Sequence, residues 1–382
     1  LARKDRFMTR RLSSCRKLAA AALAALFMPA AADACTGILI KNADGSFITG
    51  RTVEFGILLT MDVVVVPRNY QFTGQTPLGP GKSWSSKYGA TGGIIFGNVA
   101  IMDGINEKGL SVGTFYFPTF AKYTDTTKDN QAKSMSAIDF PSWILTQFSN
   151  VDEVRKAVES GEAIVAPTLL PGWPPQVQPF HWIVTDSSGK SLVIEPIDGK
   201  LVLHDNPLGV LTNSPNFDWH MTNLRNYIAL SPRDVPPVTV DGKTFQSFGM
   251  GAGMLGLPGD FTPPSRLVRA AVFSATTIPA KDTEEGVYKT FHILNNFDIP
   301  VGAARETVGG KTGADTTLLT AVRDPQNLRF YYKTYDDQTI RMIDLKKFDL
   351  DAKDVKRLST ASEQPVVDMS SKLAASKTTG NE

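Results

Sequence analysis

This sequence of 382 residues lacks two features that would point to a membrane or to nucleic acid. Its longest apolar stretch, residues 18–32, is shorter than the roughly 20 residues that a membrane-spanning helix needs. No run of Lys or Arg follows residue 34, so no basic face for phosphate groups is expected. We therefore predict no stable membrane association and no nucleic-acid partner.

The first 34 residues have the pattern of a secretory signal peptide. Basic residues between Arg3 and Lys17 precede the apolar stretch, and Ala32-Asp33-Ala34 supplies a small-residue cleavage site. Without this segment the formal net charge changes from +2 to −3, because it holds seven of the 40 basic and two of the 38 acidic residues. We predict a signal peptide at 1–34 and a mature chain that is periplasmic or secreted.

Cysteine is also scarce. Cys15 lies within the predicted signal peptide, so Cys35 is the only cysteine of the predicted mature chain. This excludes a disulfide within the mature chain and a cysteine-based zinc site. No other metal-ligand spacing or cofactor motif is present, and we expect no cofactor. A single cysteine is unusual in an exported protein, and here it directly follows the cleavage site.

Three interpretations of Cys35 remain open. The first is a small buried side chain at the start of a strand. The second is an acylated lipoprotein cysteine, although Ala32-Asp33-Ala34 fits the usual Leu-small-small box poorly. The third is an N-terminal nucleophile whose freed α-amine is the general base for its own thiol. We favour the third, because the ordinary pKa values of an α-amine, ~7.7 to 8.0, and of a thiol, ~8.5, are well matched for proton transfer.

Residues 35–55 predict a β-hairpin that returns to Cys35. Turn-forming residues at 42–45 separate two strand-like segments. The second segment brings Arg51 and Glu54 back towards Cys35, where Arg51 would favour the thiolate and Glu54 would orient the α-ammonium group. The alternative is an ordinary surface pair of opposite charges, which contributes little.

Four sequence blocks carry a family resemblance. They lie at residues 35–55 (CTGILIKN and GRTVEF), 103–118 (DGINEKGLSVGTFYFP), 209–220 (GVLTNSPNFDWH) and 256–269 (GLPGDFTPPSRLVR). In this order and spacing they resemble the choloylglycine hydrolase family, which contains bile salt hydrolases and penicillin V acylases and belongs to the N-terminal nucleophile hydrolases. The similarity extends to about residue 350.

The resemblance implies roles for five residues. Cys35 matches the family nucleophile, Arg51 the arginine beside it, and Arg266 the second family arginine. Glu54 stands where many members have aspartate, so the charge is kept on a longer side chain. Asn213 matches the asparagine of the oxyanion hole, which stabilises developing negative charge. Taken alone, Asn213 could be a turn residue and Arg266 a residue at a helix start.

Tyr116 separates two branches of the family by resemblance. Bile salt hydrolases usually have asparagine at this position, whereas penicillin V acylases have tyrosine. A tyrosine would make the wall of the site more apolar and place a ring beside a flat acyl group. Alternatively, Phe115, Tyr116 and Phe117 simply pack the core of a strand, in which case alternation would point Tyr116 away from its neighbours.

Histidine, the usual catalytic base, forms no recognisable motif in this sequence. The four histidines fit neither the HExxH spacing nor a triad with a GxSxG serine. We predict that they are structural; they are His181, His204, His220 and His292.

The order of predicted elements indicates an α+β fold. Strands are predicted at 92–105, 108–117, 181–196, where a polar turn at 187–189 divides the segment, 200–205, 316–324 and 328–336. Helices are predicted at 136–148, 150–161, 217–230, 265–276 and 284–296, and Asn150 with Glu153 has the pattern of a helix cap. The resemblance identifies this arrangement as the four-layer αββα sandwich of the N-terminal nucleophile hydrolases. We predict one amide hydrolase domain at 35–361 and a disordered tail at 362–382, which has no apolar face.

These observations predict a cysteine amidohydrolase that acts on linear amides. By resemblance, the expected substrate joins a hydrophobic acyl group to a small polar amine, as in penicillin V or an acyl-homoserine lactone. Conjugated bile salts are the alternative substrate. An exported protein of the same fold that binds its ligand without catalysis is the alternative from another class. The resemblance also implies a homotetramer.

Overall fold

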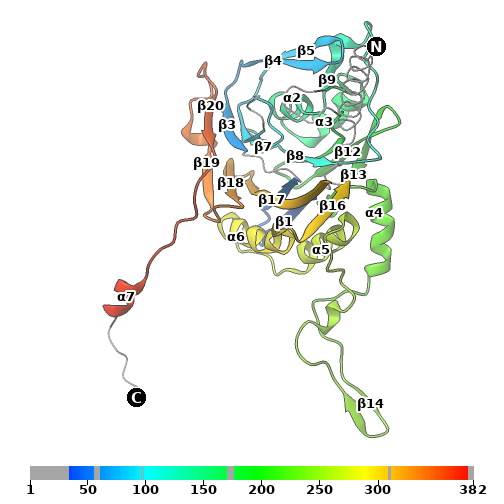
Figure 1. Cartoon of the computed structure of the whole chain (residues 1–382), viewed down its shortest axis with the longest axis vertical. Helices are drawn as coiled ribbons and strands as arrows, with labels where there is room; N and C mark the ends of the chain where they lie inside the picture. The colour runs from blue at the N-terminus through cyan, green and yellow to red at the C-terminus, as the bar shows by residue number, and fades with distance from the viewer. Residues whose placement is uncertain are drawn as a thin grey trace, which may run out of the picture.

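The computed structural model describes residues 34–55, 61–95, 97, 99–169, 176–308 and 311–376. The predicted signal peptide therefore lies outside the described residues except for Ala34. Two stacked β-sheets form the centre of the molecule, and helices cover their outer faces (Figure 1). This is the predicted four-layer αββα arrangement.

The first sheet contains the predicted N-terminal hairpin. Strand β1 (Cys35–Lys41) pairs antiparallel with β2 (Phe47–Phe55), and Gly45 has a positive φ of 87° in the turn that joins them. The long strand β17 (Lys311–Asp324) pairs with the other edge of β2. The sheet continues with β18 (Arg329–Thr334) and β19 (Arg341–Asp344), while β16 (Ala304–Val308) pairs with the first part of β17.

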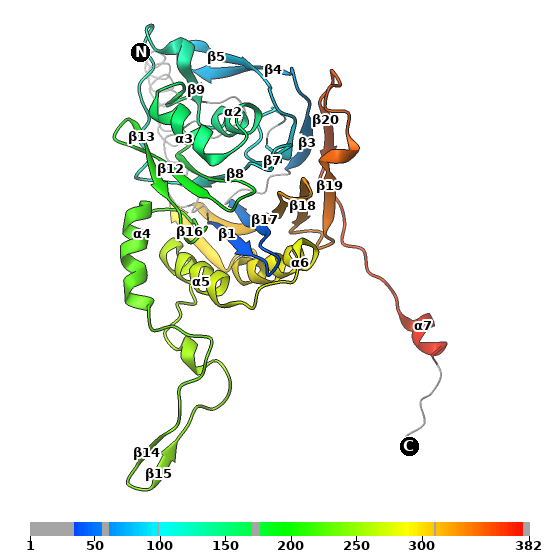
Figure 2. The ribbon, with the colours of Figure 1, turned by 180° about the vertical axis from the view of Figure 1, so that it is seen from behind.

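The second sheet has eight strands and lies over the first (Figure 2). In spatial order these are β13 (Lys200–Asp205), β12 (Ser191–Ile197), β11 (Phe180–Thr185), β8 (Ser111–Tyr116), β7 (Asp103–Asn106), β6 (Ala90–Ile94), β3 (Asp62–Val66) and β20 (Lys356–Ser359). The predicted strand at 92–105 is wrong as a single element, because it is divided between β6 and β7. Gly97, with a positive φ of 77°, lies in the connection that reverses the chain.

Helices cover the outer face of each sheet. Helices α2 (Asp139–Gln147) and α3 (Val151–Glu159) pack on the second sheet, and α5 (Pro263–Thr276) and α6 (Thr283–Leu294) pack on the first. Helix α4 (Phe217–Leu224) lies beside the sandwich. Helix α3 begins as predicted, since the Asn150 side chain accepts a hydrogen bond from the backbone N–H of Glu153.

Two segments project from the sandwich (Figures 1 and 2). Residues 228–259, which we call the arm, carry the small hairpin of β14 (Val238–Val240) and β15 (Lys243–Phe245). The chain after β20 carries the five-residue helix α7 (Ser370–Ala374), and residues 363–376 are exposed. The remaining short strands are β4 (Gln71–Thr76), β5 (Gly79–Ser85), β9 (Ser134–Ser136) and β10 (Ile164–Ala166). None of the described helices has the length and apolarity needed to cross a membrane.

Candidate active site

The N-terminal hairpin places Cys35 beside two of the predicted site residues. Cys35 is buried at the first position of β1 and pairs with Val53 of β2, so Arg51 and Glu54 lie on the strand next to it. Strand β17 flanks the same part of β2, where Ala321 pairs with Arg51 and Thr317 with Glu54. The predicted hairpin is confirmed, and it brings these charged residues into the interior rather than to the surface.

Asn213 joins the start of β1 to the second sheet. Its Oδ1 accepts a hydrogen bond from the backbone N–H of Cys35 at 2.9 Å, and its Nδ2 donates to the carbonyl oxygen of Tyr116 at 2.8 Å. The loop that carries it is fixed against β1 by two backbone hydrogen bonds between Gly37 and Leu211. In this chain the Cys35 nitrogen belongs to a peptide bond with Ala34, and it stands in for the α-amine of a processed chain.

Arg266 holds Cys35 from the side of helix α5. Its guanidinium group donates to the carbonyl oxygen of Cys35, to Thr36 Oγ1 at 2.9 Å and to Asn213 Oδ1 at 2.6 Å. Its Nε donates to the carbonyl oxygen of Phe261 at 2.8 Å. Burial lowers the pKa of Arg266, which is fully enclosed. Arg266 therefore fixes the orientation of Cys35 and Asn213 together.

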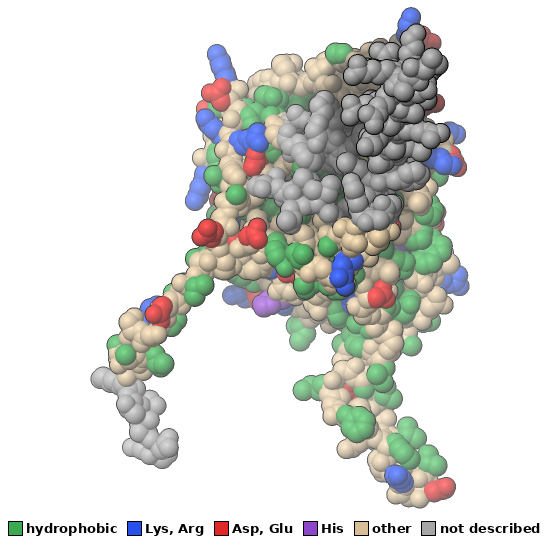
Figure 3. All heavy atoms as spheres, in the orientation of Figure 1, with side chains coloured by type: hydrophobic (Ala, Val, Ile, Leu, Met, Phe, Trp, Pro, Cys, Tyr) green, Lys and Arg blue, Asp and Glu red, His purple; other side chains and the backbone are tan. Residues whose placement is uncertain are grey.

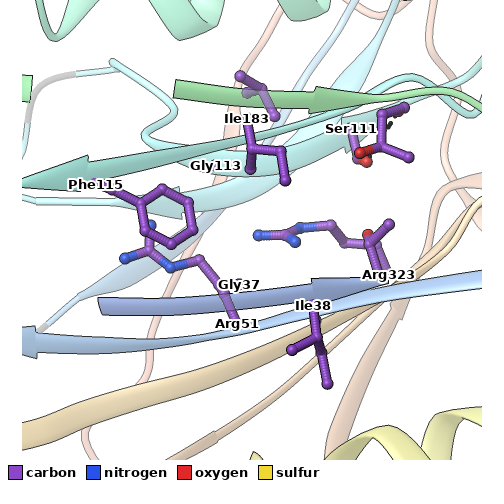
Figure 4. Close-up of a pocket in the computed structure, with 12 residues that line it drawn as sticks. Gly37, Ile38, Arg51, Ser111, Gly113, Phe115, Ile183 and Arg323 are labelled. Carbon is purple, nitrogen blue, oxygen red and sulfur yellow. Dashed lines mark hydrogen bonds between the residues drawn. The ribbon is translucent and has the colours of Figure 1, made fainter. Parts of the chain in front are cut away.

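Arg51 lies in a buried charge cluster between the two sheets. Its guanidinium group donates to the carbonyl oxygen of Thr114 and lies 4.3 Å from the centre of the Phe115 ring. Its NH1 is 3.6 Å from Asp103 Oδ2, which also accepts a hydrogen bond from Arg323. Figure 4 shows the Arg51 guanidinium against Phe115 and the Arg323 side chain in the pocket between the sheets. One carboxylate faces two arginines, so this cluster has an excess of positive charge beside Cys35.

Glu54 is buried, with 1% of its surface exposed. Its Oε1 accepts a hydrogen bond from Thr317 Oγ1 at 3.1 Å, whereas its Oε2 has no hydrogen-bond partner among the described residues. Burial raises the pKa of this carboxyl group to about 8, and the charges of Arg266 and Arg51 oppose the shift. Glu54 is thus a buried acid with one oxygen still able to accept a hydrogen bond.

An apolar cavity opens at Cys35. Cys35, Arg51, Glu54 and Tyr116 line it together with a set of mostly apolar side chains, which are Val53, Phe55, Met61, Ile95, Met102, Asp103, Thr114 and Phe180. The five site residues from the resemblance, together with Tyr116, are therefore brought together around Cys35.

Tyr116 and Phe115 belong to different layers. Phe115 packs with Cys35 and Ile183 between the sheets, whereas Tyr116 packs in the core under α2 and α3 and meets the Phe180 ring edge-on at 6.2 Å. The predicted alternation along this strand is confirmed. Tyr116 therefore lines the cavity and also packs in the core, and its place beside an acyl group stays a prediction.

A second groove has a volume of about 570 Å³ and shares no lining residue with the apolar cavity. Ala34, Asn213 and Arg266 line it with residues from the start of α5 and from strands β16 and β17. Ala34 lines the groove and Cys35 lines the apolar cavity, so two consecutive residues of the chain line the two spaces.

Two of the histidines support the loop that carries Asn213. His181 Nε2 is 3.0 Å from the carbonyl oxygen of Thr212, and His220 Nε2 is 2.9 Å from that of Asn213. His181 also contacts the buried carboxylate of Glu195, which accepts hydrogen bonds from the start of α4. No histidine lines the cavity at Cys35. Sequence reasoning missed this supporting role, for which the sequence contains no local signal.

Within the described ranges, no group of three or more His, Cys, Asp or Glu side chains is close enough to hold a metal ion. Arg51 and Arg266 at Cys35 instead donate to protein oxygens, and among the residues described Glu54 accepts a hydrogen bond through Oε1 alone. The arrangement has a thiol, a nitrogen adjacent to it, an amide side chain and buried arginines within one site.

Comparison with known proteins agrees with this geometry. Residues 35–358 match the family model described as linear amide C–N hydrolases, choloylglycine hydrolase family. The chain therefore belongs to the choloylglycine hydrolase family. It is 34% identical over 327 residues to the bile salt hydrolase/transferase of Clostridium perfringens, covering 84% of this chain and 95% of that protein. It is 26% identical over 320 residues to the penicillin V acylase of Pectobacterium atrosepticum, covering 78% and 77%.

Solved structures show the same fold. A variant of the conjugated bile acid hydrolase from Clostridium perfringens superposes with a TM-score of 0.77 at 30% identity, covering 87% of this chain and 99% of that one. The penicillin V acylase from Agrobacterium tumefaciens superposes with a TM-score of 0.67 at 22% identity, covering 85% and 91%. The fold is thus that of the N-terminal nucleophile hydrolases, and the family acts on linear amides.

Proposed function

We propose that this protein is a cysteine amidohydrolase whose nucleophile, Cys35, becomes the N-terminal residue when the preceding segment is removed. The observation that carries the proposal is the hydrogen bond from the Cys35 nitrogen to Asn213, which Arg266 also holds. This contact fixes the atom that would become the α-amine. Its position beside a thiol at the mouth of an apolar cavity supports a role in proton transfer.

The first half of the reaction forms an acyl-enzyme. The α-amine of Cys35 accepts the proton of its thiol, directly or through a water, and the thiolate attacks the amide carbonyl carbon. The excess positive charge of Arg51 and Arg323 favours the thiolate. Asn213 Nδ2, which has a second N–H besides the one given to Tyr116, and a backbone N–H stabilise the oxyanion.

The second half releases the two products. The Cys35 ammonium group returns the proton to the leaving nitrogen, so that the carbon–nitrogen bond breaks and the amine departs. A water molecule then attacks the thioester and releases the carboxylic acid and the free thiol. Glu54 Oε2 is the acceptor that we assign to the ammonium group, because it lacks a partner in the described part of the unprocessed chain.

The acyl cavity supports a flat, hydrophobic acyl group as the preferred substrate. Tyr116 and Phe180 form an aromatic corner, and Met61, Ile95 and Met102 complete an apolar wall. A phenoxyacetyl group, as in penicillin V, fits this chemistry, and a long-chain acyl-homoserine lactone is the next candidate.

Conjugated bile salts are the second candidate. The bile salt hydrolase/transferase of Clostridium perfringens is more similar to this chain than the penicillin V acylase of Pectobacterium atrosepticum, at 34% against 26% identity. Bile salts join a bulky steroid acyl group to glycine or taurine, so the size of acyl group that the cavity accepts separates the two candidates.

We further propose export to the periplasm or the exterior and assembly into a homotetramer. Export follows from the pattern of residues 1–34, which would also expose the Cys35 amine when cleaved. Assembly is supported by the arm, which projects from the sandwich and exposes several large apolar side chains (Figure 3).

The decisive measurement is kcat/KM for penicillin V and for glycodeoxycholate, using protein whose N-terminal residue has been shown to be Cys35. A preference for penicillin V of tenfold or more, about 1.4 kcal/mol, supports the acyl pocket described above. A preference for glycodeoxycholate moves the protein to the bile salt branch. Cys35→Ser is the blank, and a chain that retains Ala34 is the matched control, because its Cys35 nitrogen is an amide without a basic lone pair.

The alternative from another class is a binding protein that keeps the fold without catalysis. It predicts ligand binding that survives Cys35→Ser and no turnover above that blank for penicillin V, glycodeoxycholate or acyl-homoserine lactones. Activity in the chain that retains Ala34 would contradict the role of the α-amine.

A further inference from the structure

Asp315 is a buried acid in the groove that Ala34 lines, and the reaction described above does not use it. It lies on β17 opposite Ala304 of β16, and only 5% of its surface is exposed. Its Oδ1 has no hydrogen-bond partner in the ranges that the structure describes. A buried carboxylate without partners is costly, so a group that donates a hydrogen bond to it would be stabilised there.

The groove lies on the side of Cys35 where a leaving amine has to be. Ala34 is bonded to the Cys35 nitrogen and lines the groove, so removal of residue 34 opens the groove directly to the freed α-amine. In the proposed reaction the leaving nitrogen takes its proton from this same amine. The acyl half of the substrate occupies the apolar cavity, and the amine half therefore extends into the groove.

We propose that Asp315 is a specificity-determining residue that accepts a hydrogen bond from the amine half of the substrate. This inference rests on the proposed function and adds the chemical class of the amine. The groove would favour amides whose amine half presents a hydrogen-bond donor, most strongly a positively charged one, over amides with an apolar or anionic amine half.

The other charged groups in or near the groove are either engaged in hydrogen bonds within the protein or exposed, so Asp315 is the acceptor that remains. Arg266 directs its donors to Cys35, Thr36, Asn213 and Phe261. The carboxylate of Asp260 accepts hydrogen bonds from Thr262 and Ser265 at the start of α5. Arg305 and Glu306 on β16 are exposed.

The charge of Asp315 depends on pH near neutrality. Burial raises the pKa of Asp315 to about 7; the Arg266 charge opposes this shift and the Glu306 charge adds to it. Arg305 and Asp260 are the other charged groups that line the groove. Preference for a cationic amine half should therefore be strong at pH 8, where Asp315 is ionised, and weak at pH 6.

The test uses phenoxyacetyl amides that share one acyl group and differ in the amine half. The amine halves are 2-aminoethyl, which carries an ammonium group, 2-hydroxyethyl, n-propyl and carboxymethyl. At pH 8 we expect kcat/KM for the 2-aminoethyl amide to exceed that for the propyl amide by about tenfold. In Asp315→Asn we expect this ratio to fall to about one to twofold, while hydrolysis of the propyl amide changes by less than about threefold. Glu306→Gln removes a nearby exposed charge and should keep the ratio.

Three results would overturn the inference. First, the ratio of kcat/KM values could stay unchanged in Asp315→Asn. Second, Glu306→Gln could lower this ratio as much as Asp315→Asn does. Third, Asp315→Asn could lose activity on the propyl amide as well as on the other amides, which would indicate a structural role. Failure of the proposed function looks different, because the wild-type protein would then turn over none of the amides above the Cys35→Ser blank, and the inference would fall with it.

Discussion

At the scale of single residues, Asn213 uses both ends of its side-chain amide at the site. The oxygen accepts from Cys35 and Arg266, and the nitrogen donates to the carbonyl oxygen of Tyr116. We expect Asn213→Ala to lower kcat by about 10²- to 10³-fold, because both an oxyanion donor and an anchor for the Cys35 nitrogen are lost. Steady-state kinetics on the preferred amide measures this change.

The matched control for this prediction is Asn216→Ala in the same loop. Asn216 precedes α4, and its side chain makes no capping hydrogen bond, so its loss should change kcat by no more than a few-fold. Equal kcat values for the two variants would show that the amide of Asn213 has no part in the chemistry.

Glu54 predicts a difference in stability between the unprocessed and the processed chain. Its pKa is raised to about 8 in the folded state, compared with about 4.5 in the unfolded state. The contribution of Glu54 to the free energy of unfolding is therefore highest below pH 4.5, where Glu54 is protonated in both states, and it decreases as the pH rises towards 8. With Ala34 retained, Glu54→Gln should therefore become more stable than wild type by about 1.4 kcal/mol per pH unit within that window, as an upper bound.

Urea unfolding between pH 5 and pH 8 measures this effect in both forms of the chain. After processing, the Cys35 ammonium group would donate a hydrogen bond to Glu54 Oε2. The difference in the free energy of unfolding between Glu54→Gln and wild type should then become smaller. Glu284→Gln, on an exposed position of α6, is the control that should show no such trend. If the difference in unfolding free energy between Glu54→Gln and wild type does not change with pH in the unprocessed chain, Glu54 is not buried in a protonated state.

At the scale of elements, the loop between β13 and α4 depends on His220 for its position. His220 is fully buried, and its Nε2 donates to the carbonyl oxygen of Asn213. Burial lowers the pKa of His220 to about 4. Between pH 6.5 and pH 4, His220 is therefore neutral in the folded chain but protonated in the unfolded chain. The stability contributed above pH 6.5 is lost as the pH falls through 4.

We expect this loss to reach about 3 kcal/mol and to be removed by His220→Gln, which keeps a donor near Nε2 but does not titrate. Unfolding free energies between pH 7 and pH 4 would show a flatter profile for the variant. His292→Gln changes an exposed histidine of α6 and should retain the wild-type profile. Parallel profiles for His220→Gln and wild type would exclude His220 as the acid-sensitive group.

Elements defined by local signals could be predicted from the sequence. The turn residues of the N-terminal hairpin, the Asn150 cap and the alternation around Tyr116 each act over a few residues, and the structure confirms them. Contacts between distant segments could not be derived in this way. The hydrogen bond from Cys35 to Asn213 spans 178 residues, and only the family resemblance placed Asn213 at the site.

The groove with Asp315 had no signal at all in the sequence. Asp315 stands in a polar stretch at the start of β17, where it pairs with Ala304 of β16 and lines the groove together with residues of α5 and of the Asn213 loop. Likewise, the strand predicted at 92–105 failed because a glycine connection and the pairing order of β6 and β7 depend on the whole sheet. Tertiary packing determines the burial of a side chain and the division of a segment into two strands, and local residue propensities do not contain this information.

At the scale of the whole molecule, the arm presents apolar surface that no other described part of the chain covers. Phe248 and Met250 are fully exposed, and Ile228 and Leu255 are more than 80% exposed. In Figure 3 apolar side chains are spread along the arm as it projects from the sandwich. Surface of this kind marks an interaction site, and a second copy of the chain is the partner that the proposed homotetramer supplies.

We expect the double substitution Phe248→Ser and Met250→Ser to lower the molecular mass in solution from four chains towards one, because it removes the apolar contact surface of the arm. Size-exclusion chromatography with light scattering measures the mass. Ile278→Ser is the matched control, since Ile278 is 82% exposed but lies outside the arm, between α5 and α6. Because Cys35 and its partners all lie within one sandwich, the double variant should still hydrolyse amides, although with lower thermal stability. An unchanged mass would show that the arm contacts another partner. Equal dissociation by Ile278→Ser would show that the apolar side chains of the arm are not specifically required for assembly.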